Sequence, residues 1–145
     1  MKTVSRSVEE TSEIAAKWVE GLEPLAERAT IVGLAGDLGS GKTAFTKAVA
    51  KALGVTEFVT SPTFVLEKIY QLPGHQGFAH LIHIDAYRLE GGSELLDIGF
   101  ADIRQKSDNL ILIEWPEKVA DALPSDMVKI DFTFVNENER EINFV

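Results

Sequence analysis

One loop motif constrains this chain more than any other feature: the segment from Gly36 to Thr43 reads G-D-L-G-S-G-K-T and fits the pattern G-x-x-x-x-G-K-[ST]. Glycines let the backbone adopt conformations closed to other residues, so that successive N–H groups can point at one anion. The apolar run 30–35 before the loop predicts a short buried strand. After the loop, apolar residues recur with helical spacing as far as Leu53, and Gly54 marks the helix end. Strand, loop and helix in this order predict a binding site for the phosphates of a nucleoside triphosphate.

Within this motif, two side chains have distinct expected roles. Lys42 is expected to bring a positive charge to the β- and γ-phosphates, and the Thr43 hydroxyl to bind Mg²⁺. The alternative is a glycine-rich turn between core elements with Lys42 in solvent, which the flanking strand and helix disfavour. The residues of this segment expected to contact the nucleotide are Gly36, Asp37, Leu38, Gly39, Ser40, Gly41, Lys42, Thr43 and Ala44.

Length and composition favour one ordinary globular domain over residues 1–145, with a single core. The chain is 45% hydrophobic and 26% charged, and it has no apolar run near the roughly 20 residues of a membrane span. The first residues lack the apolar stretch of a secretory signal. Because the chain contains no cysteine, disulfides and thiolate metal sites are excluded. We therefore expect a cytoplasmic protein that is not bound to a membrane.

The formal net charge of −9, from 14 basic and 23 acidic residues, bears on nucleic-acid binding. A protein that binds nucleic acid by itself normally carries a basic patch that displaces counterions from phosphates. Basic residues here are scattered, and no basic cluster alternates with aromatic residues. If the protein acts on RNA, we expect another subunit to hold the RNA.

The remaining pattern predicts an α/β fold with a mixed, largely parallel central sheet. Ser7 is expected to begin a helix, because Glu10 three residues later completes a capping-box pattern. The other expected elements are strands over 64–70, 78–84 and 110–113, short helices over 93–98 and 101–104, a helix starting at Pro116, and a terminal antiparallel hairpin formed by 128–135 and 140–145.

Two apolar runs end in an acidic residue, Asp85 and Glu114. In an open α/β sheet, ligands bind beyond the carboxyl ends of the strands, where a carboxylate can hold Mg²⁺ or orient a water molecule. Glu114 follows the cleaner run and is expected to bind the metal, whereas Asp85 is expected to orient water or to assist the metal. The alternative is that each acid only caps the turn after its strand.

The hydroxyl-rich segment 60–63 follows the loop helix, where residues that sense a phosphate often lie. Ser61 and Thr63 are candidates to contact the γ-phosphate or its Mg²⁺ and to rearrange after hydrolysis. Equally, these hydroxyls could cap their own loop, and local sequence does not decide between the two. His80 and His83 do not form a metal pair on a strand, where residues three apart face opposite sides, so we expect a structural or supporting role.

Guanine specificity usually appears as N/T-K-x-D together with D-x-x-G, and neither pattern occurs in the chain. ATP is therefore expected in preference to GTP.

Four segments together resemble one family, TsaE, also called YjeE, in both order and spacing. They are the loop 36–43, S-P-T-F at 61–64, H-I-D-A-Y-R at 83–88 and I-E-W-P at 113–116. Each of the last three means little alone, but behind this loop their combination is specific. The resemblance covers practically the whole chain, from the Ser7 helix to the final hairpin.

The resemblance to TsaE, the small ATPase of bacterial tRNA threonylcarbamoyladenosine synthesis, implies a P-loop NTPase-like three-layer α/β sandwich that binds ATP and Mg²⁺. It implies slow intrinsic hydrolysis that depends on the partner pair TsaB–TsaD. In the family, TsaD transfers the threonylcarbamoyl group to adenosine 37 of certain tRNAs, and TsaE does not. The implied role of the ATP cycle is to support multiple turnover by that pair.

By position, Thr43 and Glu114 match the family's Mg²⁺ ligands, and Asp85 matches its other essential acid. The resemblance thus implies catalytic roles for Lys42, Asp85 and Glu114, and metal binding by Thr43, Glu114 and Asp85.

Three further positions match the family with a looser implication. Thr11 and Arg140 occupy recurrent positions that are expected near the nucleotide. Trp115 also matches, and two roles remain open for it, as a contact surface and as packing.

Three functions are compatible with these residues. The first is a partner-dependent ATPase, which the loop, the two acids and the missing guanine motifs favour. The second is a small-molecule kinase, because the same loop serves phosphoryl transfer to alcohols. The third is a nucleotide-gated binding module whose output is association with a partner.

Overall fold

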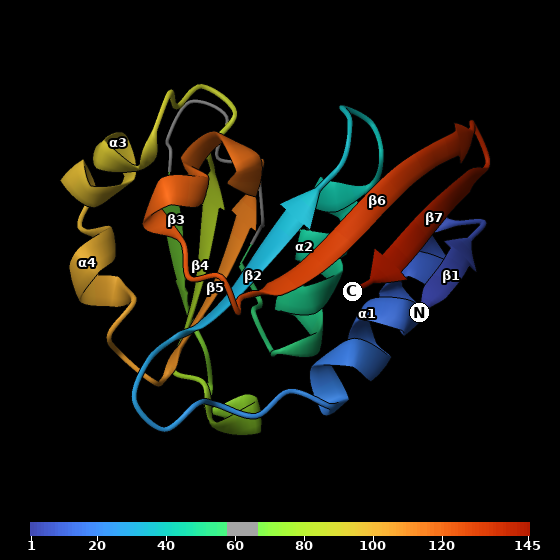
Figure 1. The fold of residues 1–145 in the computed structure, drawn as a ribbon. Coiled ribbons are helices and arrows are strands. Elements are labelled where there is room, and N and C mark those ends of the chain that lie inside the picture. The colour runs from blue at the N-terminus through green and yellow to red at the C-terminus, as the bar shows by residue number, and fades with distance from the viewer. Residues whose placement is uncertain (58–66) are drawn as a thin grey trace.

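A mixed β-sheet with helices on both faces organises the protein (Figure 1). The structure is a computed structural model that describes residues 1–57 and 67–145. Its elements are β1 (Lys2–Ser5), α1 (Val8–Glu20), β2 (Thr30–Ala35), α2 (Lys42–Ala52), β3 (Glu67–Gln71), η1 (His75–Gly77), β4 (His80–Asp85), α3 (Gly92–Asp97), α4 (Phe100–Ile103), β5 (Asn109–Glu114), η2 (Pro116–Ala122), β6 (Val128–Asn136) and β7 (Glu139–Phe144), in which η denotes a 3₁₀ helix.

In the described residues the sheet has seven strands in the order β1-β7-β6-β2-β5-β4-β3. The four central strands β6, β2, β5 and β4 are parallel, whereas β3 pairs with β4, and β7 with β6 and β1, in antiparallel fashion. The expected mixed α/β sheet with an antiparallel C-terminal hairpin is therefore confirmed. Parallel pairing is confined to the centre of the sheet.

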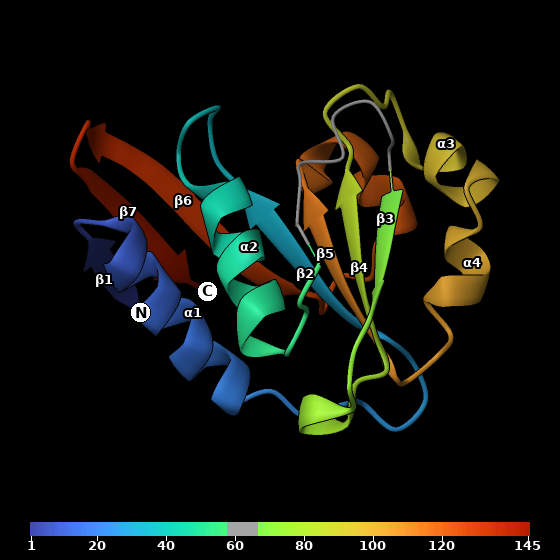
Figure 2. The same ribbon diagram turned by 180° about the vertical axis from the view of Figure 1, so that it is seen from behind.

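Two clusters of buried side chains, one on each face of the sheet, give three layers. Successive residues of the central strands alternate between the clusters: Val32 and Leu34 face α1 and α2, whereas Ile31 faces the other side. The second cluster packs against α3, α4 and η2. Figure 2 shows α1 and α2 in front of β6 and β7, and α3 and α4 beside the β3 edge.

Most elements lie within a few residues of their expected positions. The first helix begins where Ser7 predicts it, because the Ser7 hydroxyl accepts a hydrogen bond of 3.0 Å from the Glu10 N–H. The Glu10 carboxylate accepts from the N–H of Arg6, not from that of Ser7 as in a strict capping box. Residues 64–66 of the expected strand 64–70 lie outside the described residues, and β3 begins at Glu67.

Strand β1 was not expected from the sequence. It pairs with β7 and so extends the sheet beyond the terminal hairpin. A strand this short is held by its partner's hydrogen bonds and leaves little trace in the residue pattern. Of the helices in the described part of the chain, none has the length and apolar character needed to cross a membrane.

Candidate functional site

The loop between β2 and α2 has the backbone that its glycines predict. Gly36, Gly39 and Gly41 have φ angles of 149°, 77° and 107°, which residues with a side chain rarely adopt. A Cβ atom at Gly36 would overlap the carbonyl oxygen of Phe132 on β6. The loop is therefore fitted closely against the sheet at this glycine.

Helix α2 begins directly after the loop, with Gly41 as its N-cap. Gly41 has no side chain that could cap this end, and the first turn of the helix contains no acidic residue. The first N–H groups of an α-helix have no partner within the helix, and with the positive end of the helix dipole they favour an anion. The expected order of strand, glycine-rich loop and helix is confirmed by this arrangement.

A cavity of about 660 Å³ opens beside the loop. Its walls come from four parts of the chain: the loop with the start of α2, the segment joining β1 to α1, the ends of β4 and β5, and the turn between β6 and β7. The expected site residues that line it are Thr11, Leu38, Gly39, Gly41, Lys42, Thr43, Ala44, Asp85, Glu114 and Arg140.

Other expected site residues do not line this cavity. Gly36, Asp37 and Ser40 belong to the loop but lie outside the cavity wall. Ser61 and Thr63 fall outside the described residues, so their expected contact with the γ-phosphate stays a prediction.

The Lys42 ammonium lies beneath the loop between two internal partners. Its Nζ donates a hydrogen bond to the Gly36 carbonyl and lies 3.6 Å from the centroid of the Trp115 ring. Burial lowers the pKa of Lys42, while the negative charges of Glu114 and, to a lesser extent, Glu117 act in the opposite sense. The solvated lysine of the alternative interpretation is thus wrong, because Lys42 is only 4% exposed.

The two acids lie side by side at the carboxyl ends of adjacent parallel strands. Asp85 on β4 stands opposite Glu114 on β5 in the register of the sheet. The Thr43 hydroxyl, in the first turn of α2, donates a long hydrogen bond of 3.5 Å to Glu114 Oε1. The sheet therefore brings both predicted acids and the predicted hydroxyl ligand to one end of the cavity.

Asp85 also serves the turn that follows its strand. Its Oδ1 accepts a hydrogen bond of 3.0 Å from the N–H of Tyr87. The turn-capping interpretation thus holds for one oxygen of Asp85. Its presence in the cavity wall beside Glu114 is compatible with a chemical role in addition.

The donor set suits Mg²⁺ bound together with phosphates. The described residues contain no group of three or more His, Cys, Asp or Glu side chains that could hold a metal ion by themselves. Magnesium is usually bound by one or two carboxylates with substrate phosphates and waters, not by a complete protein cage. The Thr43 hydroxyl and the carboxylates of Glu114 and Asp85 fit this requirement in both chemistry and number.

The C-terminal hairpin is tied to the loop through Arg140. Its Nε donates to the Gly39 carbonyl at 2.9 Å, and its Nη1 donates to the Asn136 carbonyl at 2.6 Å. At the other side of the cavity the Thr11 hydroxyl lies 2.6 Å from the Ser5 hydroxyl, which joins α1 to β1. Thr11 and Arg140, expected near the nucleotide from the resemblance alone, both lie in the cavity wall.

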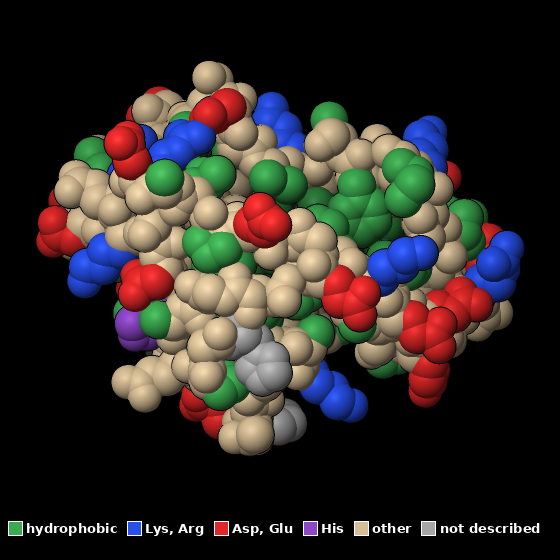
Figure 3. Space-filling model, turned by 90° about the horizontal axis from the view of Figure 1, so that it is seen from below, with side chains coloured by type: hydrophobic (Ala, Val, Ile, Leu, Met, Phe, Trp, Pro, Cys, Tyr) green, Lys and Arg blue, Asp and Glu red, His purple; other side chains and the backbone are tan. Residues whose placement is uncertain are grey.

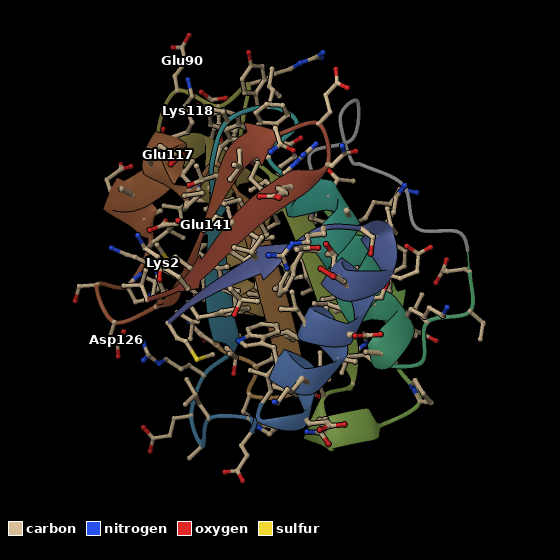
Figure 4. The ribbon with its side chains drawn as sticks, turned by 90° about the vertical axis from the view of Figure 1, so that its right-hand side faces the viewer. Lys2, Glu90, Glu117, Lys118, Asp126 and Glu141 are labelled. Carbon is tan, nitrogen blue, oxygen red and sulfur yellow. The ribbon has the colours of Figure 1, made fainter. Side chains whose placement is uncertain are left out.

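Trp115 follows Glu114 with a φ angle of 61°, a left-handed conformation that non-glycine residues seldom adopt. Its ring packs 5.1 Å from the Tyr87 ring, centroid to centroid, as well as beneath Lys42. Packing is therefore observed, and because Trp115 also lines the cavity, its expected role as a contact surface stays a prediction. In Figure 4, Glu117 and Lys118 of the following η2 lie toward the same end of the molecule as Glu90, whereas Asp126 lies toward the opposite end.

Sequence reasoning missed part of the cavity wall. Tyr87 and Arg88 both belong to the H-I-D-A-Y-R segment, but the sequence reasoning gave Tyr87 no role and considered Arg88 only for the kinase alternative. The others follow from tertiary structure alone, because the β1–α1 junction and the β6–β7 turn are far apart in the sequence. The missed lining residues are Ser5, Arg6, Ser7, Val8, Tyr87, Arg88, Glu137 and Asn138.

A family model described as "Threonylcarbamoyl adenosine biosynthesis protein TsaE" matches residues 5–142. The chain belongs to the TsaE family. Two TsaE proteins, each described as a "tRNA threonylcarbamoyladenosine biosynthesis protein", illustrate the similarity. The one from Treponema pallidum is 37% identical, with 98% of each chain covered, and the one from Bacillus subtilis is 39% identical, with 82% of this chain and 71% of the relative covered.

The fold is also similar to that of a solved structure. The crystal structure of Bacillus subtilis YdiB superposes with a TM-score of 0.77 at 30% sequence identity, covering 99% of this chain and 83% of the other. Membership of the TsaE family thus accounts for the order of the motifs, and the likeness to YdiB extends to the fold that carries them.

Proposed function

We propose that this TsaE-family protein is a cytoplasmic, Mg²⁺-dependent ATPase required for threonylcarbamoyladenosine formation at adenosine 37 of tRNA. In this proposal it acts with the TsaB–TsaD pair and supports the turnover of that pair, without transferring the threonylcarbamoyl group itself. Its own hydrolysis is weak, and the partners stimulate it. The tRNA is reached only through the partners.

One observation carries the ATPase assignment: a glycine loop leading into an uncapped helix, with a buried lysine beneath it and two acids beside it. In the proposed reaction the loop amides and the Lys42 ammonium hold the β- and γ-phosphates. Thr43 and Glu114 would hold Mg²⁺, which would neutralise part of the negative charge of the phosphates. Asp85 orients the attacking water molecule.

Membership of the TsaE family supports the pathway and, with it, the partners. The preference for ATP rests on the missing guanine motifs of the sequence. The positions of Thr11 and Arg140 in the cavity wall support a nucleotide that extends from the loop toward the β1–α1 junction.

A phosphate-release assay on the chain alone, with the TsaB–TsaD pair, and with the pair plus tRNA tests the proposal. We expect slow Mg²⁺-dependent release by the chain alone and faster release with the pair. Unchanged release, together with no complex in the presence of nucleotide, contradicts it. A phosphorylated small molecule in place of free phosphate would support the kinase, and tight ATP binding without turnover even in the full assembly would support the binding module.

A further inference from the structure

His83 is a buried polar side chain for which the proposed reaction has no use. It is fully buried on β4, two residues before Asp85, so both side chains lie on the same face of the strand. In the register with β5 it stands beside Leu112, which belongs to the cluster under α1 and α2. Glu114, two residues beyond Leu112, therefore projects from the same face of the sheet.

The His83 ring holds one oxygen of the Glu114 carboxylate. Its Nε2 lies 2.5 Å from Glu114 Oε2, and the side chains are 0% and 5% exposed. With an ionised carboxylate the ring Nε2–H is the donor, whether or not the other ring nitrogen also carries a proton. A short hydrogen bond to a charged, buried acceptor is among the stronger kinds. The second oxygen, Oε1, is left toward the Thr43 hydroxyl at 3.5 Å.

The geometry points to His83 as a positioning residue that orients the Glu114 carboxylate for Mg²⁺. The inference rests on the proposed function, in which Glu114 and Thr43 are the metal ligands. By engaging Oε2, the imidazole restricts rotation of the carboxylate and keeps Oε1 directed at Thr43 and the cavity. Partners of this kind, which touch a ligand and not the metal, typically affect metal affinity by 10- to 100-fold.

A purely structural His83 would donate a hydrogen bond to the buried Glu114 carboxylate without affecting metal binding. A thermodynamic cycle separates this structural role from the positioning role. The affinity for a fluorescent, non-hydrolysable ATP analogue is measured once with Mg²⁺ and once with EDTA. The ratio of the two dissociation constants gives the gain in affinity due to the metal and involves no turnover. His83→Leu removes the donor and retains bulk, whereas His83→Gln places an amide N–H close to the position of Nε2.

We expect His83→Leu to reduce the Mg²⁺-dependent gain by about 10-fold or more, with the affinity in EDTA unchanged. His83→Gln should restore most of the gain. The matched control is His80→Leu on the same strand, where the side chain is half-buried and away from the cavity, and it should keep the gain of the wild type. An undiminished gain in His83→Leu overturns the inference, and so does an equal loss of affinity with and without Mg²⁺.

A second measurement needs no variant and covers the case in which His83→Leu does not fold. In ¹⁵N-histidine-labelled wild-type protein, NMR reports which ring nitrogen carries a proton. A proton on Nε2 of His83 supports the inference, and a ring protonated on Nδ1 alone overturns it. Wild-type protein that binds no nucleotide contradicts the proposed function itself, whereas a normal Mg²⁺ gain that His83→Leu retains contradicts only the role of His83.

Discussion

Lys42 is a buried cation whose direct contacts are with a backbone carbonyl and an aromatic ring. Its ammonium is buried between the Gly36 carbonyl and the face of Trp115, and the carboxylate of Glu114 contributes a favourable field. Both direct partners are neutral, so neither competes for the charge as a salt bridge would. The Lys42 ammonium is therefore available to pair with a phosphate that binds at the loop.

Replacing Lys42 by methionine tests this role at the residue scale. The substitution retains an unbranched buried stem and removes the charge, so we expect ATP turnover to fall by about 100-fold or more while the protein stays folded. Lys47→Met is the control, since Lys47 lies exposed on the same helix. Turnover is followed by phosphate release and folding by circular dichroism. Wild-type turnover in Lys42→Met would remove Lys42 from the mechanism.

We predict that replacing each acid by its amide, as Glu114→Gln or Asp85→Asn, impairs a different step of the reaction. Glu114 is buried and contacts Thr43, whereas one oxygen of Asp85 already accepts a hydrogen bond from the Tyr87 N–H. We therefore expect Glu114→Gln to weaken the Mg²⁺ dependence of nucleotide binding. Asp85→Asn should leave that dependence intact and lower kcat. Steady-state rates and nucleotide titrations across Mg²⁺ concentrations check both; the reverse pattern would exchange the two roles.

At the scale of elements, the site depends on how closely the loop is fitted to its neighbours. Gly36 faces the Phe132 carbonyl on β6, whereas a Cβ at Gly39 would meet nothing within 4 Å. Both glycines have positive φ angles, so a side chain at either is strained. Only Gly36 would add a clash with the backbone of the sheet.

Alanine substitution should separate strain from overlap. Gly39→Ala should cost about 1–2 kcal/mol of unfolding free energy, from backbone strain alone. Gly36→Ala should cost more, because the loop must move away from β6, and it should also abolish nucleotide binding. Urea unfolding and a fluorescent-nucleotide titration measure the two effects. Equal losses of stability would show that the close fit at Gly36 contributes nothing.

The sequence predicts the elements with strong local patterns and fails where tertiary contacts decide. The loop, α1 with its Ser7 cap, the buried run of β5 and the C-terminal hairpin were all expected, since apolar period and capping residues specify them. By contrast, β1 exists through its pairing with β7. The positive φ of Trp115 likewise has no local signal, because propensity disfavours it and the surrounding packing must impose it.

On the scale of the whole molecule, the cavity is assembled from nearly the full length of the chain. Residues from the β1–α1 junction, the central loop, β4, β5 and the β6–β7 turn all reach it. This follows from the order of the strands, because β7 pairs with the edge of β6 that faces away from β2, and β1 pairs with β7. The positions of the two acids could thus be predicted from the ends of the strands. The presence of residues 5–8 in the cavity wall could not, because it depends on the order of the strands in the sheet.

The net negative charge of the chain argues against direct binding of nucleic acid. The chain carries −9 overall, and on the face shown in Figure 3 Lys and Arg side chains are interspersed with Asp and Glu. Because binding of nucleic acid requires displacement of counterions by clustered cations, we expect no complex of the chain alone with tRNA at about 0.15 M salt. With the TsaB–TsaD pair present, tRNA should be retained in the assembly. Filter binding over a salt series measures both, and a salt-sensitive complex of the chain alone would show that the protein contacts RNA directly.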